Sequence, residues 1–216
     1  MDVANTIVNF DEKVIPIMEP TLHTTWAFGP VLENQMQKIK HSGITIPFNA
    51  CSVRHRALTD MTEQTIEILQ GPLPEYIAFF LMEPLRFEGD LKLSSTKMET
   101  HSLSEFSLLL DNVVQENYPL KVIKHDDNKF YHEFYRRWLL ETDRYRDTDS
   151  QIMSEDEYIT QNFIILERFR DFENQAGYLS VKLKFDEELK NKLYLCWMPC
   201  YKKRINFDKH LSVQVT

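Results

Sequence analysis

His132 and Glu133 open the segment His132-Glu133-Phe134-Tyr135-Arg136, which begins like the metal-binding helix of a zinc peptidase. That chemistry needs a second histidine four residues after the first, so that two imidazoles share one helix face. Arg136 occupies that position. The segment therefore predicts no zinc site, and we expect Glu133 to be solvated or ion-paired.

Two acidic groups offer a second kind of chemistry. His125-Asp126-Asp127 sets an imidazole beside two carboxylates, which could bind a metal or orient a general base. A simpler role is to cap the helix that follows, because aspartate accepts free backbone N–H groups and complements the helix dipole. We favour the cap. Glu155-Asp156-Glu157 lacks the Asp-x-Asp-x-Asp-Gly spacing of a calcium loop and is typical of a first helical turn.

The three cysteines are Cys51, Cys196 and Cys200. Their number is odd and too small for a disulfide framework, which favours a reducing compartment such as the cytosol. Cys196 and Cys200 would point the same way on a strand, but zinc needs about four ligands and only His210 is nearby. The spacing therefore predicts buried, inert thiols.

Catalytic signatures are otherwise missing from the sequence. It contains no Gly-x-Ser-x-Gly elbow and no Gly-x-x-x-x-Gly-Lys phosphate loop. A metal-dependent enzyme of the cupin type needs clustered histidines and glutamates, and His55 with His210 is too little. We therefore assign no catalytic, cofactor-binding or metal-binding residue, and we expect the protein not to be an enzyme.

The net charge of −8 and the pI near 5.4 disfavour nucleic acid as a partner. The strongest basic run, Tyr201-Lys202-Lys203-Arg204, is typical of a solvated strand edge that blocks unwanted pairing. The N-terminal residues lack the pattern of a secretory signal. The longest apolar run, Tyr76–Met82, is far shorter than the ~20 residues that span a bilayer, so we expect no membrane span.

Most of the chain alternates between apolar and polar residues in short runs separated by turn residues, which predicts strands. The run Tyr76–Met82 is apolar on both faces and predicts a central strand. Asp111-Asn112 predicts a turn. The predicted strands are 6–10, 13–17, 43–47, 51–58, 64–69, 76–82, 106–110, 120–124, 162–166, 178–185, 193–198, 204–207 and 211–215.

Helices interrupt this pattern in few places. Aromatic residues repeat at i, i+4 between 128 and 145, which predicts a helix capped by Asp126, Asp127 or Asn128. The aromatic stripes could form a peptide groove or a stacking platform, but we favour a core face. Ser154 and Glu157 predict a capping box for a second helix. A further short helix is indicated by Leu32, Met36 and Ile39. The stripes are Phe130, Phe134, Trp138 and Tyr131, Tyr135, Leu139.

Even strand spacing without βαβ alternation predicts an all-β antiparallel sandwich of jelly-roll type, with one or two helical insertions. No linker-like or low-complexity stretch divides the sequence. We therefore expect a single domain over residues 1–216.

Six short motifs occur in a recognisable order and spacing. The chain resembles the C-terminal jelly roll of the double-jelly-roll major capsid proteins of Polinton/Maverick elements and adintoviruses. The resemblance covers residues 45–216, where strand and turn segments of this sequence are similar to those of the family. These motifs lie at 70–82, 101–111, 118–120, 126–131, 177–185 and 191–208, the last with the ending Ile205-Asn206-Phe207-Asp208.

The resemblance implies a virion structural protein, made in the host cytoplasm, whose partners are other capsid subunits of the same or another kind. It implies no small-molecule substrate. The chain departs from the family in having one jelly roll where the family has two. Where the family has an Asp-Gly hairpin, this chain has Asp111-Asn112-Val113. At a later strand end it has Glu167-Arg168-Phe169-Arg170 in place of the family's sequence. The alternative hypothesis is a domesticated, virus-derived host protein that binds a protein or glycan.

Overall fold

The computed structural model describes residues 7–10, 13–16, 37, 43–89, 94, 96–125, 128–142, 153–169, 175–189, 192–207 and 213–215. The chain divides into two compact units, one of Met1–Thr45 with Asn206–Gln214 and one of Ile46–Ile205 with Val215–Thr216. In the first unit, the two predicted strands are present as β1 (Ile7–Phe10) and β2 (Lys13–Pro16), and they pair antiparallel. Leu32, Met36 and Ile39, which indicated a helix, lie outside the described residues, but Gln37 between them is described and is helical. The single domain over 1–216 stays a prediction.

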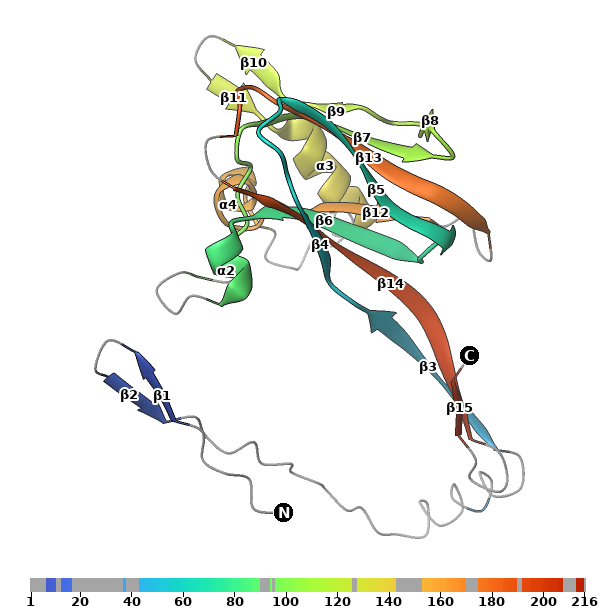
Figure 1. The fold of residues 1–216 in the computed structure, drawn as a ribbon. Coiled ribbons are helices and arrows are strands. Elements are labelled where there is room, and N and C mark those ends of the chain that lie inside the picture. The colour runs from blue at the N-terminus through green and yellow to red at the C-terminus, as the bar shows by residue number, and fades with distance from the viewer. Residues whose placement is uncertain are drawn as a thin grey trace. The chain divides into compact units, whose positions relative to one another are not determined.

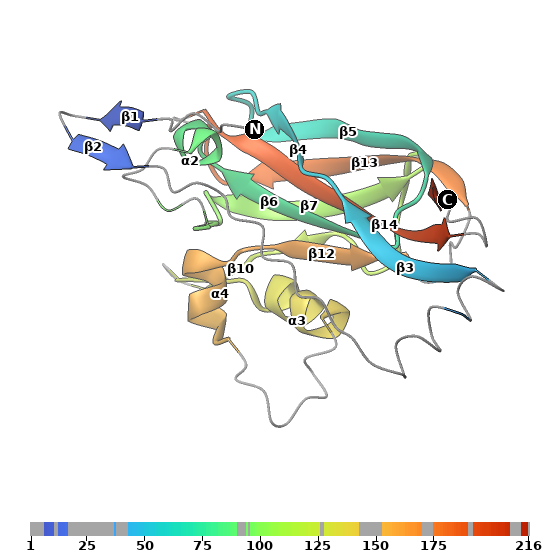
Figure 2. The same cartoon turned by 90° about the horizontal axis from the view of Figure 1, so that it is seen from below.

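Two antiparallel sheets form the sandwich (Figures 1 and 2). In sheet 1, β6 lies between β12 and β14, and β14 also pairs with β15, β3 and β4. In sheet 2, β13 lies between β5 and β7, and β7 also pairs with β8 and β9. The all-β antiparallel sandwich of jelly-roll type is thus confirmed.

The strands of sheet 1 are β3 (Ile44–Cys51), β4 (Arg54–Ala57), β6 (Tyr76–Met82), β12 (Ile165–Arg168), β14 (Tyr194–Phe207) and β15 (Val213–Val215). The strands of sheet 2 are β5 (Glu63–Pro72), β7 (Leu103–Leu110), β8 (Val113–Val114), β9 (Leu120–Lys121) and β13 (Ala176–Phe185).

The central strand β6 is buried on both faces, as predicted. Its residues Ile77, Phe79 and Leu81 belong to the main core between the sheets. Phe80 and Met82 point to the other face, where they form a second cluster with Cys196 and Phe87 of α2 (Pro84–Glu88).

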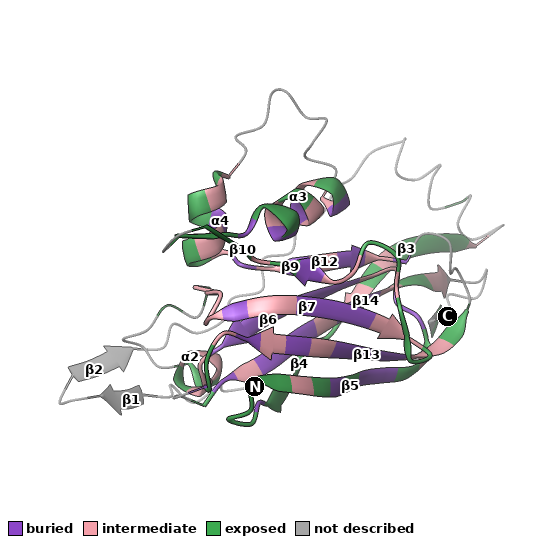
Figure 3. Cartoon of the chain, turned by 90° about the horizontal axis from the view of Figure 1, so that it is seen from above, coloured by how far each residue is buried: buried purple, intermediate pink, exposed green. Residues whose placement is uncertain are grey.

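Strict alternation builds the opposite wall of the core. Leu179, Val181, Leu183 and Phe185 of β13 are all buried, which confirms the predicted apolar face. Figure 3 shows buried residues along the facing strands of both sheets. Because burying a large apolar side chain stabilises by roughly 1.5–3 kcal/mol, this shared core is the principal force that holds the two sheets together.

The turn at Asp111-Asn112 joins β7 to β8, as predicted. Both residues have positive φ, 51° and 64°, which a two-residue hairpin of type I′ requires. The Asp111 carboxylate accepts a hydrogen bond from the backbone N–H of Tyr178 (2.8 Å). The turn therefore also holds the start of β13.

The predicted helix at 128–145 is wrong at its start. Asn128–Phe130 forms β11, which pairs with β10 (Ile123–His125) in a hairpin. The helix, α3, is His132–Glu141, and its N-cap residue is Tyr131. The reason is tertiary, because Lys124 and Lys129, which face each other across the hairpin, both bind Asp186 at 2.5 and 2.7 Å.

Other predicted boundaries also moved. Cys51 ends β3, so the strand expected at 51–58 is β4 and begins only at Arg54. The strands expected at 193–198 and 204–207 are one continuous β14, and the one expected at 120–124 is divided between β9 and β10. The helix α4 (Glu155–Gln161) begins at the predicted capping box of Ser154 and Glu157.

Candidate functional site

The densest group of buried ionisable side chains lies where α3 packs against β12. Arg137 of α3 forms an ion pair with Glu167 of β12 and a second one with Glu141 at 3.3 Å, one helical turn further on. The hydroxyl of Tyr118 donates to the same Glu167 oxygen at 2.7 Å. The Arg137 guanidinium carbon also lies 5.8 Å from the centre of the Tyr118 ring.

The local sequence explains why a carboxylate lies here. In β12, Ile165 and Glu167 are buried while Leu166 and Arg168 are less so, which means that Glu167 occupies an inward position of an alternating strand. On α3, Phe134 and Trp138 are buried and Arg137 lies beside them. The helix therefore directs its guanidinium to the one strand residue that can neutralise it.

The aromatic side chains of α3 that were predicted to form a core face, Phe134 and Trp138, are buried against other rings. The Phe134 ring lies 5.4 Å from that of Phe163, and the Trp138 ring lies 5.6 Å from that of Tyr158 on α4. Phe130 is the exception, because it belongs to β11 and is partly exposed.

Burial and the charges within the cluster together keep it in one protonation state. Burial raises the pKa of Tyr118 well above its usual value, and the Glu167 charge adds to that effect. Although burial alone would lower the pKa of Arg137, Glu167, Tyr118 and Glu141 together outweigh it and raise the pKa. A protonated phenol and a charged guanidinium thus share one Glu167 oxygen, an arrangement that positions α3 on β12.

The residues near α3 that the sequence analysis weighed as candidates and rejected, His132 and Glu133, make structural contacts. His132 Nδ1 lies 2.7 Å from Glu155 Oε2 and joins α3 to α4. Glu133 Oε2 accepts a hydrogen bond from the backbone N–H of Lys121 at 2.7 Å, so the expectation of a solvated or ion-paired glutamate was incomplete.

The proposed cap at 126–128 is wrong in its one described member, because Asn128 lies in β11 and the N-cap is Tyr131. His125 is in β10, and Asp126 and Asp127 lie outside the described residues. Glu155, Asp156 and Glu157 occupy the first turn of α4, as predicted. Among the described residues, no three His, Cys, Asp or Glu side chains are placed to hold a metal ion.

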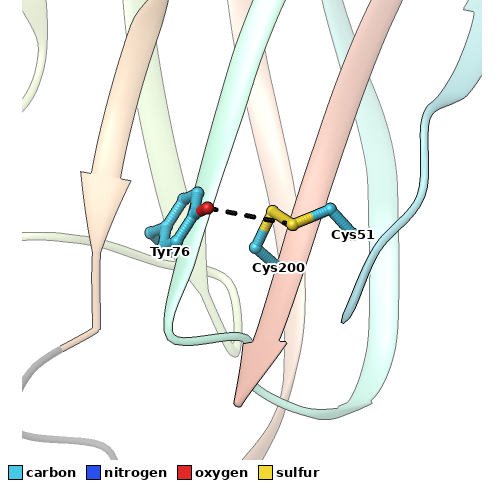
Figure 4. The surroundings of a disulfide bond; sticks show 3 residues. All are labelled: Cys51, Tyr76 and Cys200. Atoms are coloured by element: carbon cyan, nitrogen blue, oxygen red, sulfur yellow. Dashed lines mark hydrogen bonds between the residues drawn. A yellow bond between two sulfur atoms is a disulfide. The ribbon is translucent and has the colours of Figure 1, made fainter. Parts of the chain in front are cut away.

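The expectation of an inert thiol is wrong for Cys200, and so is the inference from the cysteine count that the chain is fully reduced. Cys51 at the end of β3 and Cys200 in β14 form a disulfide, and the Tyr76 hydroxyl lies 3.8 Å from Cys51 Sγ (Figure 4). The sequence separation of 149 between the two cysteines explains why spacing along the sequence did not reveal the pair. Cys196 is free and fully buried, and burial raises its pKa to about 12, as expected of an inert thiol.

The basic run at 201–204 is exposed at its three cations but does not lie on an edge strand. β14 pairs with β6, β15, β3 and β4, so the edge prediction is wrong. Lys202 pairs with Glu75 at 3.0 Å. His55 contacts the rings of Phe87 and Tyr194, while His210 lies outside the described residues.

Sequence reasoning missed the cluster of Tyr118, Arg137, Glu141 and Glu167. One signal was available, because Glu167 interrupts the inward face that Ile165 begins. No helix in the described part of the chain is long and apolar enough to cross a bilayer.

No protein-family model matches the chain, and no curated protein matches it either. Among solved structures it is similar to a chain in the cryo-EM structure of the Sputnik virophage, with 11% sequence identity and a TM-score of 0.46. The match covers 81% of this chain and 39% of the virophage chain.

Proposed function

We propose that this chain is a non-enzymatic jelly-roll subunit of a viral capsid, which self-assembles or joins a major capsid protein. The observation that carries the proposal is that the sequence motifs resembling the capsid family overlap the strands of the structure. The motif at 70–82 ends in β6, that at 101–111 contains β7, and those at 177–185 and 191–208 contain most of β13 and β14. The segments that resemble the capsid family are therefore the segments that build this sandwich.

Exposed apolar side chains support an assembling protein. Val113 and Val114 of β8 are 65% and 47% exposed, and Ile123 and Phe130 of the β10–β11 hairpin are 51% and 36% exposed. The last two are cross-strand partners. Subunit contacts would remove such side chains from water.

Mass measurement and electron microscopy of the purified protein test the proposal. We expect rings, trimers or larger assemblies, alone or after mixing with a major capsid protein encoded beside it. A strict monomer under all conditions, with no particle partner, would reject the capsid role. Recovery from purified virions would exclude the host binding module, whereas expression in uninfected tissue together with glycan or protein binding would favour it. A packaging ATPase or protease gene next to this one would support the Polinton and adintovirus lineage.

A further inference from the structure

The strand β3 is held to the sandwich by few contacts. No residue of Ile44–Cys51 is buried, and none belongs to either apolar cluster. In the described part of the chain, β3 pairs only with β14. Because a segment with few buried apolar contacts opens at a low free energy, backbone pairing alone holds β3 weakly. The covalent link that adds to this pairing is the disulfide between Cys51 and Cys200.

The disulfide is a direct link between facing positions of the two strands. Thr45 Oγ1 donates a hydrogen bond to Asn206 Oδ1 at 2.8 Å. Cys51 lies as far after Thr45 as Cys200 lies before Asn206, and antiparallel strands without a bulge keep that correspondence. Cys51 therefore faces Cys200 across the strands, with the two Cα atoms 4.2 Å apart, and Figure 4 shows the bond that joins them.

The disulfide also marks the place where β14 loses its buried neighbour β6. Cys200 pairs with Tyr76, the first residue of β6, and Cys200 is fully buried. Beyond it, Lys202, Lys203 and Arg204 are exposed. The disulfide therefore fastens β3 at the boundary between the packed part of β14 and its exposed end.

The two sulfur atoms belong to residues that differ in access. Cys51 is exposed, whereas Cys200 is 0% exposed. Disulfides open when a thiolate attacks one sulfur and forms a mixed disulfide, and the sulfur that is attacked depends on access. An incoming thiol therefore reaches Cys51 first and displaces Cys200.

We propose that the Cys51–Cys200 disulfide is a redox lock on β3, which a small thiol of the glutathione class opens at Cys51. The thiolate bonds to Cys51 Sγ, the S–S bond breaks, and Cys200 leaves as a thiolate that takes a proton from water. A second thiolate then attacks the small thiol's sulfur in this mixed disulfide, which releases Cys51 and yields the oxidised small thiol. The protein gains the two electrons that the two small thiols lose.

Reduction releases β3 but leaves the sandwich folded. The main core is built by residues outside β3, so it loses no side chain when β3 opens. The opened state uncovers the edge of β14 that β3 had paired, and the N–H and C=O groups of such an edge accept another strand. The redox state of one bond thus sets whether this sheet edge is covered. The lock is a property of the fold and does not depend on the proposed capsid role.

Hydrogen–deuterium exchange of the full, oxidised chain, before and after excess reduced glutathione, tests the release of β3. At short labelling times we expect reduction to speed deuterium uptake in 44–51 by about tenfold or more, while β6 stays protected. Cys51→Ser changes an exposed position and should take up deuterium in 44–51 at the fast rate with or without glutathione. Cys196→Ala, the matched control, retains the disulfide and should respond as the wild type does.

Two single variants test which sulfur is attacked. After incubation with oxidised glutathione, Cys200→Ala should carry one glutathione on Cys51, whereas Cys51→Ser should carry none on Cys200; peptide mass spectrometry locates the adduct. Protection of β6 confirms that each variant is folded.

Three results overturn the lock. These are a disulfide that glutathione does not reduce in the folded protein, equal uptake in 44–51 in both redox states, and modification of Cys200 in preference to Cys51. Loss of protection in β6 at the same short times as in β3 also overturns it, because the bond would then hold the whole sandwich together.

Discussion

At the scale of single residues, the Arg137–Glu167 pair makes a sharp stability prediction. Both side chains are largely buried, with 15% and 11% exposed. Removing the Glu167 charge therefore leaves the buried Arg137 guanidinium with Glu141 as its remaining anionic partner. We expect Glu167→Gln to lower the free energy of unfolding by about 3 kcal/mol, measured by urea denaturation. The same substitution at exposed Glu116 should change it by less than about 0.5 kcal/mol. Equal effects of the two substitutions would show that the cluster does not stabilise α3 on β12.

The disulfide makes a second prediction at this scale. Denatured, unreduced protein should show one reactive thiol, Cys196, and reduction should reveal all three. The variant Cys196→Ser should show none before reduction. Because the Cys51–Cys200 bond closes a loop that spans 149 positions, we expect its reduction to lower the free energy of unfolding by about 2–5 kcal/mol. Three reactive thiols in unreduced protein would restore the original prediction of a fully reduced chain.

These residues show where sequence reasoning stops. The inert thiol at Cys196 and the first-turn acids of α4 follow from composition and from local helix rules. The disulfide and the buried Glu167 do not, because each depends on a partner distant in sequence. Glu167 meets Arg137 only after α3 has docked on β12.

At the scale of elements, the β7–β8 turn depends on two residues with positive φ. Glycine adopts that conformation without strain, whereas a β-branched residue is penalised by about 1–2 kcal/mol. We expect Asn112→Gly to retain the wild-type midpoint of thermal unfolding and Asn112→Val to lower it. If the two variants unfold at the same temperature, the turn is not of the I′ type.

The segment at 128–145 shows why element boundaries were harder to predict than element types. The i, i+4 repeat of Phe130, Phe134 and Trp138 is continuous in the sequence, but Phe130 lies opposite Ile123 in the β10–β11 hairpin. Nothing in the local sequence distinguishes an aromatic residue of the hairpin strand β11 from an aromatic residue of the helix α3. By contrast, Ser154 and Glu157 define the start of α4 through bonds within four residues, and that start was predicted correctly.

At the scale of the whole molecule, the sandwich was predictable because its core strands carry their own patterns. The alternation of apolar and polar residues in β13 indicates a strand that is covered on one face, and the continuous apolar run in β6 indicates a strand that is covered on both. The pairing of β14 with four other strands was not predictable, since its length and its partners depend on contacts between distant parts of the chain. The sequence pattern thus indicated layers but left the order of the strands open.

Acid stability is also a property of the whole molecule. The hydrogen bond from Lys182 lowers the pKa of Glu63 on sheet 2. Burial alone would raise the pKa of Asp186, but Lys124 and Lys129 outweigh it and lower the pKa. A carboxyl group whose folded pKa lies below its unfolded pKa stabilises the protein above the unfolded value, and that contribution is lost as the pH falls through the folded value.

We therefore expect the contribution of these carboxyl groups to the free energy of unfolding to be nearly constant above about pH 5 and to fall below about pH 4.5, where they begin to bind protons in the unfolded chain. Urea denaturation at a series of pH values measures it. The variant Asp186→Asn removes one of the linked groups, so its stability should decline less steeply with acid, whereas Glu116→Gln should follow the wild type. Because protonation releases Lys124 and Lys129 from Asp186, the β10–β11 hairpin should also exchange its amide hydrogens faster at low pH. Stability that rises on acidification would mean that these ion pairs do not hold the carboxyl groups in their charged form.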